Sequence, residues 1–447
     1  MDGNPYEPPQ PIVASQASRL FSDQAFWGLS ATQFLGAFND NLFKQTILLM
    51  FVAVPLAQGS SKSVDLQWLG TFCFSLPFIL FSGYGGFLSD RHPKRSVIVS
   101  CKIAEIVIMG IGVGLFAYYS KAGLPLLLVG LISGTLLLMG AQSAFFGPGK
   151  YGILPEMLRE RDIPQANGFL LMTTFLAIIL GSALAGLLLT HFEHSLWIVG
   201  LACVGIAITG TATSFLIRGG PAAQPHLPFE WSATTIPVDI RQLLRRDRSL
   251  LAAIAAGTVF WMTAAMVQMS VNALGKLQLQ VSDWRTSILV ASISAGIAVG
   301  SLVAGIASGG KFNARILKLG CYGLIACLAM LSLPGWNRSH LLGYTGSLLT
   351  LIAMGVFTGM FALPLQVYVQ TRPPADCKGR MIATQNLLNW VGITMSAALY
   401  FAAGTLFAVL QWPPCATFAV SAAMMSGVAL FYRPQSDGHE CHERNDA

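Results

Sequence analysis

Long apolar stretches alternate with short polar loops along the whole chain. A helix needs about 20 mostly apolar residues to cross the ~30 Å hydrocarbon core of a bilayer, so each stretch predicts a spanning helix. The pattern predicts twelve spans, at residues 26–56, 66–88, 96–119, 124–147, 166–190, 195–217, 249–275, 286–308, 314–333, 341–371, 381–408 and 412–432. The first and tenth are longer than a bilayer requires, and we expect them to tilt or to extend beyond it.

Composition places the chain among all-α membrane proteins. It is 54% hydrophobic and 11% charged, whereas soluble proteins carry about 25% charged residues, so most of the chain is expected to avoid water. Its net charge of +7 would suit a nucleic acid, but the basic residues lie in short loops between the apolar stretches. Such loop charges orient a membrane protein. We therefore expect the lipid bilayer, and no nucleic acid, as a partner.

Lysine and arginine are distributed unequally between the loops of the two sides. If the N-terminus is cytoplasmic, five of the 27 fall on the outer side, Lys44 and Lys102 lie inside spans, and the other 20 fall on the cytoplasmic side. The five outer residues are Lys62, Lys121, Lys276, Arg285 and Arg338. Because positive residues concentrate in cytoplasmic loops, we expect both tails, 1–25 and 433–447, to be cytoplasmic.

The longest internal polar stretch, 218–248, divides the spans into two halves of six, 26–217 and 249–432. Within it, apolar residues share a helical face beside a group of arginines, which predicts an amphipathic helix that lies on the inner leaflet. The apolar residues are Ile236, Ile240, Leu243 and Leu244, and the arginines are Arg241, Arg245, Arg246 and Arg248. Spans two and eight, at matching places, both end in small residues and a basic turn. Two related six-helix halves predict the major facilitator fold.

The loop after the second span resembles the loop signature of major facilitator transporters. Only Pro93 departs from the pattern, at a position where that family usually has glycine. The matching residues are Gly86, Asp90, Arg91, Lys94 and Arg95. Asp90 can cap a helix end and pair with an arginine, so we expect a gating loop that latches the cytoplasmic side. The alternative is that these are ordinary charges of a cytoplasmic loop.

Polar residues inside the spans are concentrated in a few helices. Such residues are costly in a membrane and usually mark function or line a cavity. Spans one, four, seven, ten and eleven carry them: Gln33, Asn39, Asp40, Asn41, Lys44; Gln142; Gln268, Asn272; Gln366, Gln370; and Gln385, Asn386, Asn389. In the major facilitator fold, spans one, four, seven and ten surround the central cavity. The pattern therefore predicts residues that handle a substrate or an ion.

Asp40 is the strongest single candidate. It lies about 14 residues into the first span, roughly 20 Å deep at 1.5 Å per residue, and a carboxylate there must be protonated or paired. Lys44, one turn further on, is the expected partner. The pair either handles substrate or ions, or is a structural ion pair between helices. The same two readings apply to Lys102 and Glu105, three residues apart in the third span.

Several motifs together resemble the lysophospholipid transporter family. Residues 32–41 carry its glutamine-phenylalanine-leucine run and aspartate-asparagine pair, and residues 148–156 resemble its proline-x-lysine-tyrosine-glycine-isoleucine-leucine loop. Ala166-Asn167-Gly168, Phe260-Trp261, Pro364-Leu365 and Gln385-Asn386-Leu387 also match.

This resemblance implies inward movement of lysophospholipids across the bacterial inner membrane for reacylation. It nominates Asp40 and Lys150 as functional residues. Family members can carry an arginine where this chain has Gln268, so a phosphate-binding cation is either absent here or supplied by Lys44 or Lys276.

The sequence shows no sign of a catalytic, cofactor or metal centre. The eight cysteines are scattered without a CxxC pair, and no histidine has an aspartate five residues on, as the acyltransferase motif of some relatives requires. We therefore expect no enzyme, cofactor or metal. Two other functions stay open: a proton-coupled exporter of small amphipathic compounds with Asp40 as its proton site, and a non-transporting membrane partner of a separate acyltransferase.

The charge asymmetry predicts the topology. In a background whose native cysteines are replaced, Lys121→Cys should react with a membrane-impermeant thiol reagent added outside the cell, and Arg245→Cys should react only after the membrane is permeabilised. Labelling of Arg245→Cys from outside would contradict the predicted orientation.

Overall fold

The computed structural model describes residues 20–55, 63–228, 236–308, 312–336, 339–374 and 377–432. Most of both predicted tails, together with Lys62 and Arg338, lies outside these residues. The described chain is almost entirely helical. Its long helices are α1 (Gln24–Phe51), α2 (Gln67–Arg91), α3 (Lys94–Ala122), α4 (Leu126–Gly152), α6 (Ile163–His191), α7 (Trp197–Ser214), α9 (Arg248–Ala273), α10 (Asp283–Ser308), α11 (Ala314–Leu331), α12 (Gly343–Thr371), α13 (Lys378–Val409) and α14 (Thr417–Phe431).

The shorter elements lie between these helices. They are α5 (Leu154–Met157), α8 (Val238–Arg246), a π-helical turn η4 (Leu274–Gln278), the 3₁₀ turns Leu20–Ser22, Glu160–Asp162 and Pro414–Ala416, and the strands β1 (Val54–Pro55) and β2 (Ser63–Val64). The two strands form an antiparallel pair between α1 and α2.

Eleven helices of the described chain are long and apolar enough to cross a membrane. The twelfth long helix is α1, with 28 residues. Its run of Asn39, Asp40 and Asn41, followed by Lys44, interrupts the apolar sequence in the middle of the helix. The expected all-α membrane fold is confirmed, and the chain is a multi-pass membrane protein.

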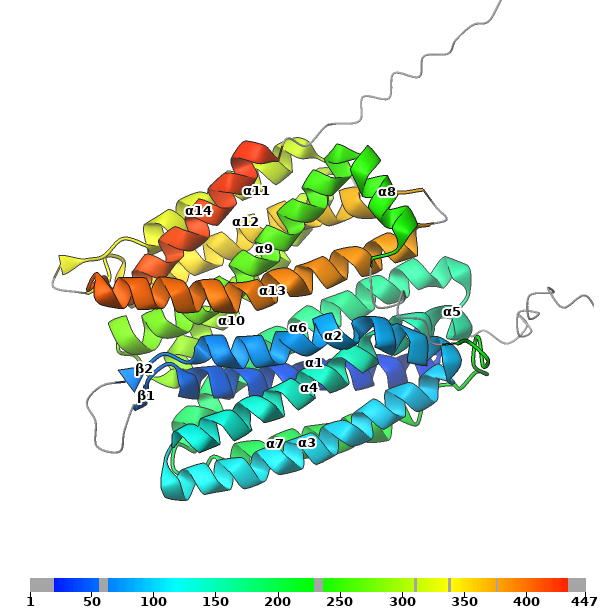
Figure 1. The fold of residues 1–447 in the computed structure, drawn as a ribbon, viewed down its shortest axis with the longest axis horizontal. Coiled ribbons are helices and arrows are strands. Elements are labelled where there is room, and N and C mark those ends of the chain that lie inside the picture. The colour runs from blue at the N-terminus through cyan, green and yellow to red at the C-terminus, as the bar shows by residue number, and fades with distance from the viewer. Residues whose placement is uncertain are drawn as a thin grey trace, which may run out of the picture.

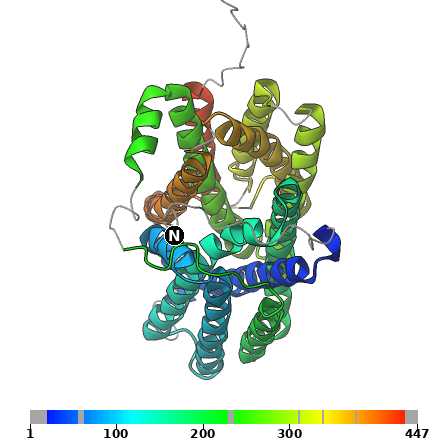
Figure 2. The same ribbon diagram turned by 90° about the vertical axis from the view of Figure 1, so that its right-hand side faces the viewer.

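The twelve long helices form two groups, which are α1–α4 with α6 and α7, and α9–α14. The two groups lie side by side (Figures 1 and 2). In the first group α2 packs on α4, α1 on α6 and α3 on α7; in the second, α10 and α11 pack on α12, and α13 packs on α9. The groups meet along two seams, where α2 contacts α13 and α6 contacts α10. Figure 1 shows the first group below and the second above.

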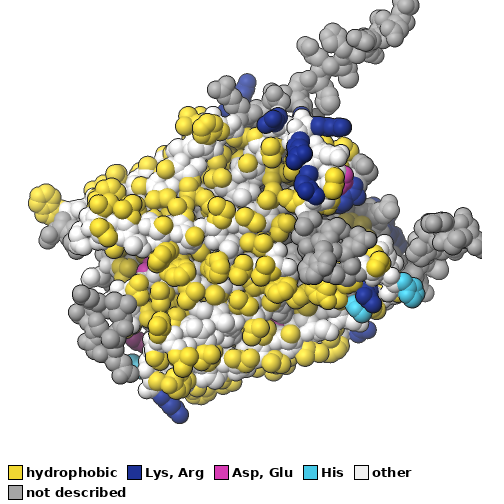
Figure 3. Space-filling model, viewed as in Figure 1, with side chains coloured by type: hydrophobic (Ala, Val, Ile, Leu, Met, Phe, Trp, Pro, Cys, Tyr) yellow, Lys and Arg dark blue, Asp and Glu magenta, His cyan; other side chains and the backbone are white. Residues whose placement is uncertain are grey.

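The two ends of the bundle differ in charge. We call the end that holds α5 and α8 the basic end, and the end that holds β1 and β2 the hairpin end. In the space-filling view, hydrophobic side chains cover the flank, while most visible lysine and arginine side chains gather near α8 (Figure 3). An apolar flank between polar ends is the surface expected of a protein that spans a bilayer.

Glycines allow α10 and α12 to approach backbone to backbone. A Cβ atom on Gly300 would overlap the carbonyl oxygen of Val356. A Cβ atom on Gly296 or Gly355 would also overlap a backbone carbonyl oxygen of the facing helix. Membrane helices use small residues in this way because no hydrophobic force draws them together in lipid, so close van der Waals contact must do so.

Gly300→Ala should separate α10 from α12 and lower the stability of the protein by about 1–3 kcal/mol, as expected for overpacking. Gly305→Ala, on the same helix, is the matched control. Its added Cβ would lie 3.7 Å from the nearest atom, Leu363 Cδ2, so it should stabilise α10 by up to about 1 kcal/mol. Thermal unfolding in detergent measures both. Equal melting temperatures for the two variants would contradict close packing at Gly300.

Candidate functional site

Asp40 lies in the middle of α1, beside α4. Ser143 of α4 donates a hydrogen bond of 2.7 Å to Asp40 Oδ2 and also lies 3.0 Å from Gln142 Oε1. The other carboxylate oxygen, Oδ1, is buried and has no hydrogen-bond partner among the described residues. An unpartnered buried acceptor is costly, so a proton, a water molecule or a ligand that reached this oxygen would relieve that cost.

Four charged side chains lie near enough to interact electrostatically with the Asp40 carboxylate: Lys44 of α1, Lys150 of α4, and Lys102 and Glu105 of α3. Lys44 Nζ lies over the ring of Phe74, 5.2 Å from its centroid, and Lys150 Nζ lies 4.8 Å from the centroid of Tyr151. Helices α2, α4, α6, α7 and α9 contact α1 on its several sides. The half-buried Asp40 and Lys44 therefore face the interior of the bundle and not the lipid.

The expected ion pair between Asp40 and Lys44 is not formed within the described structure. Ser143 takes the place of Lys44 as hydrogen-bond partner, and the face of Phe74 accommodates the ammonium group. An aromatic ring face attracts a cation through its quadrupole, so Lys44 is not dependent on Asp40. Asp40, Lys44 and Lys150 thus form a group of one negative and two positive side chains that make no ion pair with one another.

Behind this cluster, Lys102 and Glu105 of α3 form a buried ion pair. Each side chain is only 1% exposed. Glu105 Oε1 also accepts a 2.7 Å hydrogen bond from Asn39 Nδ2, so the pair fixes the residue next to Asp40. Gly36 and Gly210 make room for the lysine, because a Cβ on either would lie about 3 Å from its Nζ or Cε. The pair therefore links α3 to α1 and α7, and both of its charges are shielded from water.

A second set of polar residues joins the two groups of helices at the hairpin end. Gln45 of α1 donates to Asn272 Oδ1 of α9 over 2.8 Å and accepts from Gln268 over 3.1 Å. Asn272 in turn donates to Gln67 Oε1 of α2 over 2.9 Å, and Gln67 donates to the carbonyl of Met269 over 3.2 Å. We call these residues the hairpin-end network.

Further contacts between the groups surround this network. Tyr400 of α13 donates a 2.7 Å hydrogen bond to Asp65, which precedes α2. Burial raises the pKa of Asp65 to about 6, although hydrogen bonds from Gln67 and Tyr400 oppose the shift. Lys276 donates to the carbonyl of Leu49 over 3.2 Å and pairs with Asp283 over 2.7 Å. The hairpin end is therefore held closed by buried polar contacts.

At the basic end, the ion pairs of the described residues have a different arrangement. Lys94 pairs with Glu156 over 2.5 Å, which joins the start of α3 to α5 within the first group. Arg218 pairs with Asp23 in the first group, and Arg372 with Asp247 in the second. These pairs hold each group together and do not cross between the groups.

The predicted gating loop lies at this basic end. Asp90 is exposed, and its side chain has no hydrogen-bond or ion-pair partner among the described residues. Its carbonyl accepts from Gln224 N over 2.9 Å. Arg95 donates to the carbonyl of Phe215, and Arg91 lies over the ring of Phe87. A latch through Asp90 is therefore not engaged in this conformation.

The other predicted site residues have various surroundings. Gln33 is buried and donates to the carbonyl of Leu170 and to Thr174 of α6, so it fixes α1 on α6. Gln385 donates to Gln366 Oε1 over 3.2 Å, between α13 and α12. Three asparagines complete the set: Asn41 donates to the carbonyl of Ala37, Asn386 is exposed, and Asn389 Oδ1 is buried without a partner among the described residues.

Sequence reasoning missed Gln45, Gln67, Asp65, Ser143 and Tyr400. Gln45 lies inside the first predicted span, so the cost of a polar group in the membrane could have identified it. Gln67 and Asp65 lie at a predicted helix boundary, where polar residues are common. Ser143 and Tyr400 give no signal, because serine and tyrosine occur widely in membrane helices.

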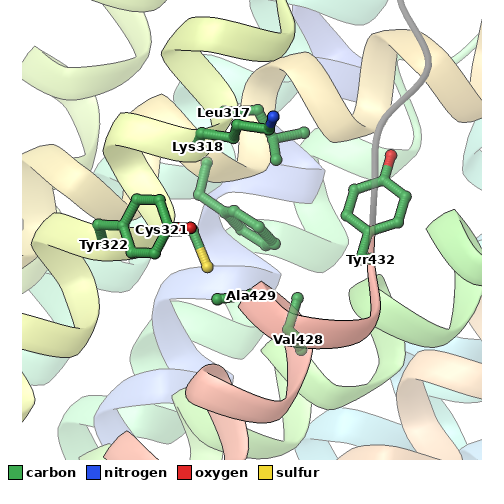
Figure 4. A pocket seen from close by; sticks show the side chains of 8 residues that line it. Leu317, Lys318, Cys321, Tyr322, Val428, Ala429 and Tyr432 are labelled. Carbon is green, nitrogen blue, oxygen red and sulfur yellow. The ribbon is translucent and has the colours of Figure 1, made fainter.

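The small pocket between α11, α12 and α14 is not a substrate site. Leu317, Lys318 and Tyr322 line it from α11, and Val428 and Tyr432 from the other side (Figure 4). Its volume of about 20 Å³ holds about one water molecule. In the part of the chain that the structure describes, no group of three histidine, cysteine, aspartate or glutamate residues is placed to hold a metal ion.

Comparison with known proteins agrees with this architecture. Residues 29–397 match the family model of the Major Facilitator Superfamily. The chain belongs to this superfamily.

The chain is 25% identical to the lysophospholipid transporter LplT of Yersinia pestis (strain Pestoides F), over 82% of this chain and 84% of that protein. This relative confirms the resemblance predicted from the motifs. Two crystal structures share the fold. A POT family transporter in complex with 5-aminolevulinic acid has a TM-score of 0.68 at 13% identity, covering 93% of this chain and 96% of that one. A mutant of the nucleoside transporter NupG has a TM-score of 0.61 at 11% identity, covering 93% of this chain and 99% of that one.

Removing one charge of the buried ion pair in α3 should destabilise the protein more than removing both. Lys102→Met leaves Glu105 buried and unpaired, and should lower stability by about 3–5 kcal/mol. The double change Lys102→Met with Glu105→Met should recover most of this loss, because no unpaired charge is left. Thermal unfolding of the purified variants tests the coupling. Additive losses in the double variant would show that the two charges act independently.

Proposed function

We propose that this protein is a secondary transporter, and not an enzyme, that moves lysophospholipids across the bacterial inner membrane by alternating access. The observation that carries the proposal is the interior cluster of Asp40, Lys44 and Lys150. The similarity to LplT supports the same substrate class. The basic end is then cytoplasmic, with both tails on that side.

The cluster has the chemistry that a zwitterionic lysophospholipid headgroup requires. Lys44 and Lys150 supply cations for the phosphate, as charge-assisted hydrogen bonds to phosphate require. Asp40, with one oxygen unpartnered among the described residues, supplies an acceptor for the ammonium group of an ethanolamine headgroup. We therefore favour a lysophosphatidylethanolamine-type substrate.

The single acyl chain needs an apolar surface next to this cluster. Phe74, under Lys44, begins a row of aromatic rings along α2. Phe78 of the same helix stacks on Trp390 of α13, with ring centroids 3.6 Å apart and an angle of 7° between the planes. These rings lie on the seam between the groups. There they can pack against the acyl chain while the headgroup binds the lysines.

Family members can carry an arginine where this chain has Gln268, and the contacts of Gln268 suggest a different role for this position. Gln268 belongs to the hairpin-end network, where it donates to Gln45. Lys276 bridges Leu49 and Asp283 at the same end. Both therefore act in closing the hairpin end, and Lys44 and Lys150 take the role of phosphate ligands.

Transport follows from rocking of the two groups about the seams. In the present conformation the hairpin-end network closes one end, and the ion pairs of the basic end stay within each group. A headgroup would thus enter or leave through the basic end. In the opposite state the network separates, and Asp90 of the gating loop latches the basic end.

A proton-coupled exporter of amphipathic compounds is the second candidate. The buried Asp40 oxygen without a described partner favours it, because a proton could occupy that site. Transport of lysophospholipid that does not change with a proton gradient would exclude this mechanism. Uptake of lysophospholipid by the purified protein in proteoliposomes would exclude the third candidate, a non-transporting membrane partner of a separate acyltransferase.

The cluster should be essential for transport. In proteoliposomes, Asp40→Asn and Lys150→Gln should each reduce uptake of labelled lysophosphatidylethanolamine to background, while the variants still insert and unfold at the wild-type temperature. Lys121→Gln is the control, because Lys121 is an exposed cation at the end of α3. Its uptake should be that of the wild type.

A double variant separates function from architecture. If Asp40 serves only to balance the charge of Lys44, the change Asp40→Asn with Lys44→Gln should transport normally. We expect it to be inactive. Full uptake by this double variant would refute the assignment of Asp40 to the substrate.

A further inference from the structure

Helix α8, in the segment between the two six-helix groups, packs on the protein and not in the leaflet. Ile240 and Leu244 of α8 are buried in the hydrophobic core of the second group, together with Leu250. Helix α8 contacts α9 and α13. The sequence predicted that this apolar face would lie on the inner leaflet, and that prediction was wrong because the ends of α9 and α13 offer an apolar surface for it.

Two ion pairs fasten α8 further to the second group. Asp239, in its first turn, pairs with Arg380 of α13 over 2.8 Å. Asp247, which follows α8, pairs with Arg372 at the end of α12 over 2.8 Å. Both acidic residues of the segment 238–248 are thus already neutralised by arginines from outside it.

The arginines of the segment are left without such partners. Arg241, Arg245, Arg246 and Arg248 are all exposed, and none forms an ion pair with another described residue. Figure 3 shows lysine and arginine side chains gathered near α8 at the basic end. Arg248 is also the first residue of α9, which is long and apolar enough to cross a membrane, so this group of arginines lies at the end of a membrane-spanning helix.

We propose that α8 is a binding surface for anionic phospholipid headgroups, held by Arg241, Arg245, Arg246 and Arg248. The guanidinium group forms bidentate hydrogen bonds to phosphate. A cluster of four to eight basic residues next to a spanning helix is sufficient to attract an anionic leaflet. A membrane surface is the partner that the geometry favours over an acidic protein, because the arginines lie where a spanning helix leaves the bilayer.

This surface has a mechanical consequence that does not depend on the identity of the transported substrate. Helix α8 is fastened to α9, α12 and α13, which all belong to the second group. Anionic lipids bound to it therefore hold the second group at the inner leaflet, while the first group is free to rock against it.

The test measures lipid binding and not transport. Purified protein in a neutral detergent is titrated with dioleoylphosphatidylglycerol or dioleoylphosphatidylcholine, and bound lipid is counted by native mass spectrometry. The wild type should prefer phosphatidylglycerol, and the preference should weaken as salt is added. Arg241→Gln, Arg245→Gln, Arg246→Gln and Arg248→Gln together should weaken phosphatidylglycerol binding about tenfold or more.

The matched control removes four positive charges elsewhere on the surface of the same end. These changes are Arg161→Gln, Arg315→Gln, Lys318→Gln and Lys378→Gln, all at exposed residues. This control should bind phosphatidylglycerol within about twofold of the wild type. Lys121→Gln, at an exposed residue outside both the α8 surface and the transport site, should do the same.

Two results would overturn the proposal: a wild type that does not distinguish the two lipids, or equal weakening in the α8 variant and the charge-matched control. The α8 changes leave Ile240, Leu244 and both ion pairs intact, so the variant should fold. If this variant unfolds at a lower temperature than the wild type, the double variant Arg241→Gln with Arg245→Gln provides the same comparison with two of the four charges removed.

Discussion

A charged or polar group inside the hydrocarbon core must find a partner within the protein, because water is not available there. This constraint organises the first group of helices. Lys102 and Glu105 satisfy each other in α3, and Glu105 also holds Asn39 of α1. The next residue, Asp40, is left with one hydrogen bond, from Ser143, and one free oxygen among the described residues. The Lys102–Glu105 pair, whose charges are paired, thus positions the Asp40 carboxylate, which has only one hydrogen bond from the described residues. A ligand can gain binding energy at the Asp40 oxygen that has no described partner.

The same constraint determines which end of the bundle is closed. Glutamine and asparagine are well suited to reversible contacts, because each amide donates and accepts and none carries a charge that must stay paired. Gln45, Gln67 and Asn272 satisfy one another when the hairpin end is closed. If the groups separate there, water entering the opening can replace these bonds at small net cost. Charged pairs such as Lys94 with Glu156 instead hold elements of one group together, where no separation is needed.

The basic end shows how a membrane protein can use charge outside the core. Asp239 and Asp247 bind α8 to the second group, and the arginines beside them stay available at the bilayer surface. On our proposals, the orientation of the chain in the membrane and the attachment of the second group to the inner leaflet arise from the same residues. An arginine that serves the positive-inside rule is also a ligand for phosphate, so topology and lipid binding are physically linked.

Much of this protein was determined by sequence alone. Hydropathy is a local property, so the long helices and their order could be predicted from the sequence, and the motifs indicated the family. The cost of polar groups in lipid singled out Asp40, Lys44, Gln268 and Asn272. Tertiary structure decided which groups meet. Gln45 and Asn272 are 227 positions apart, and the apolar face of α8 could have met either lipid or protein. Such pairings depend on how helices rotate and pack against each other, which no local pattern specifies.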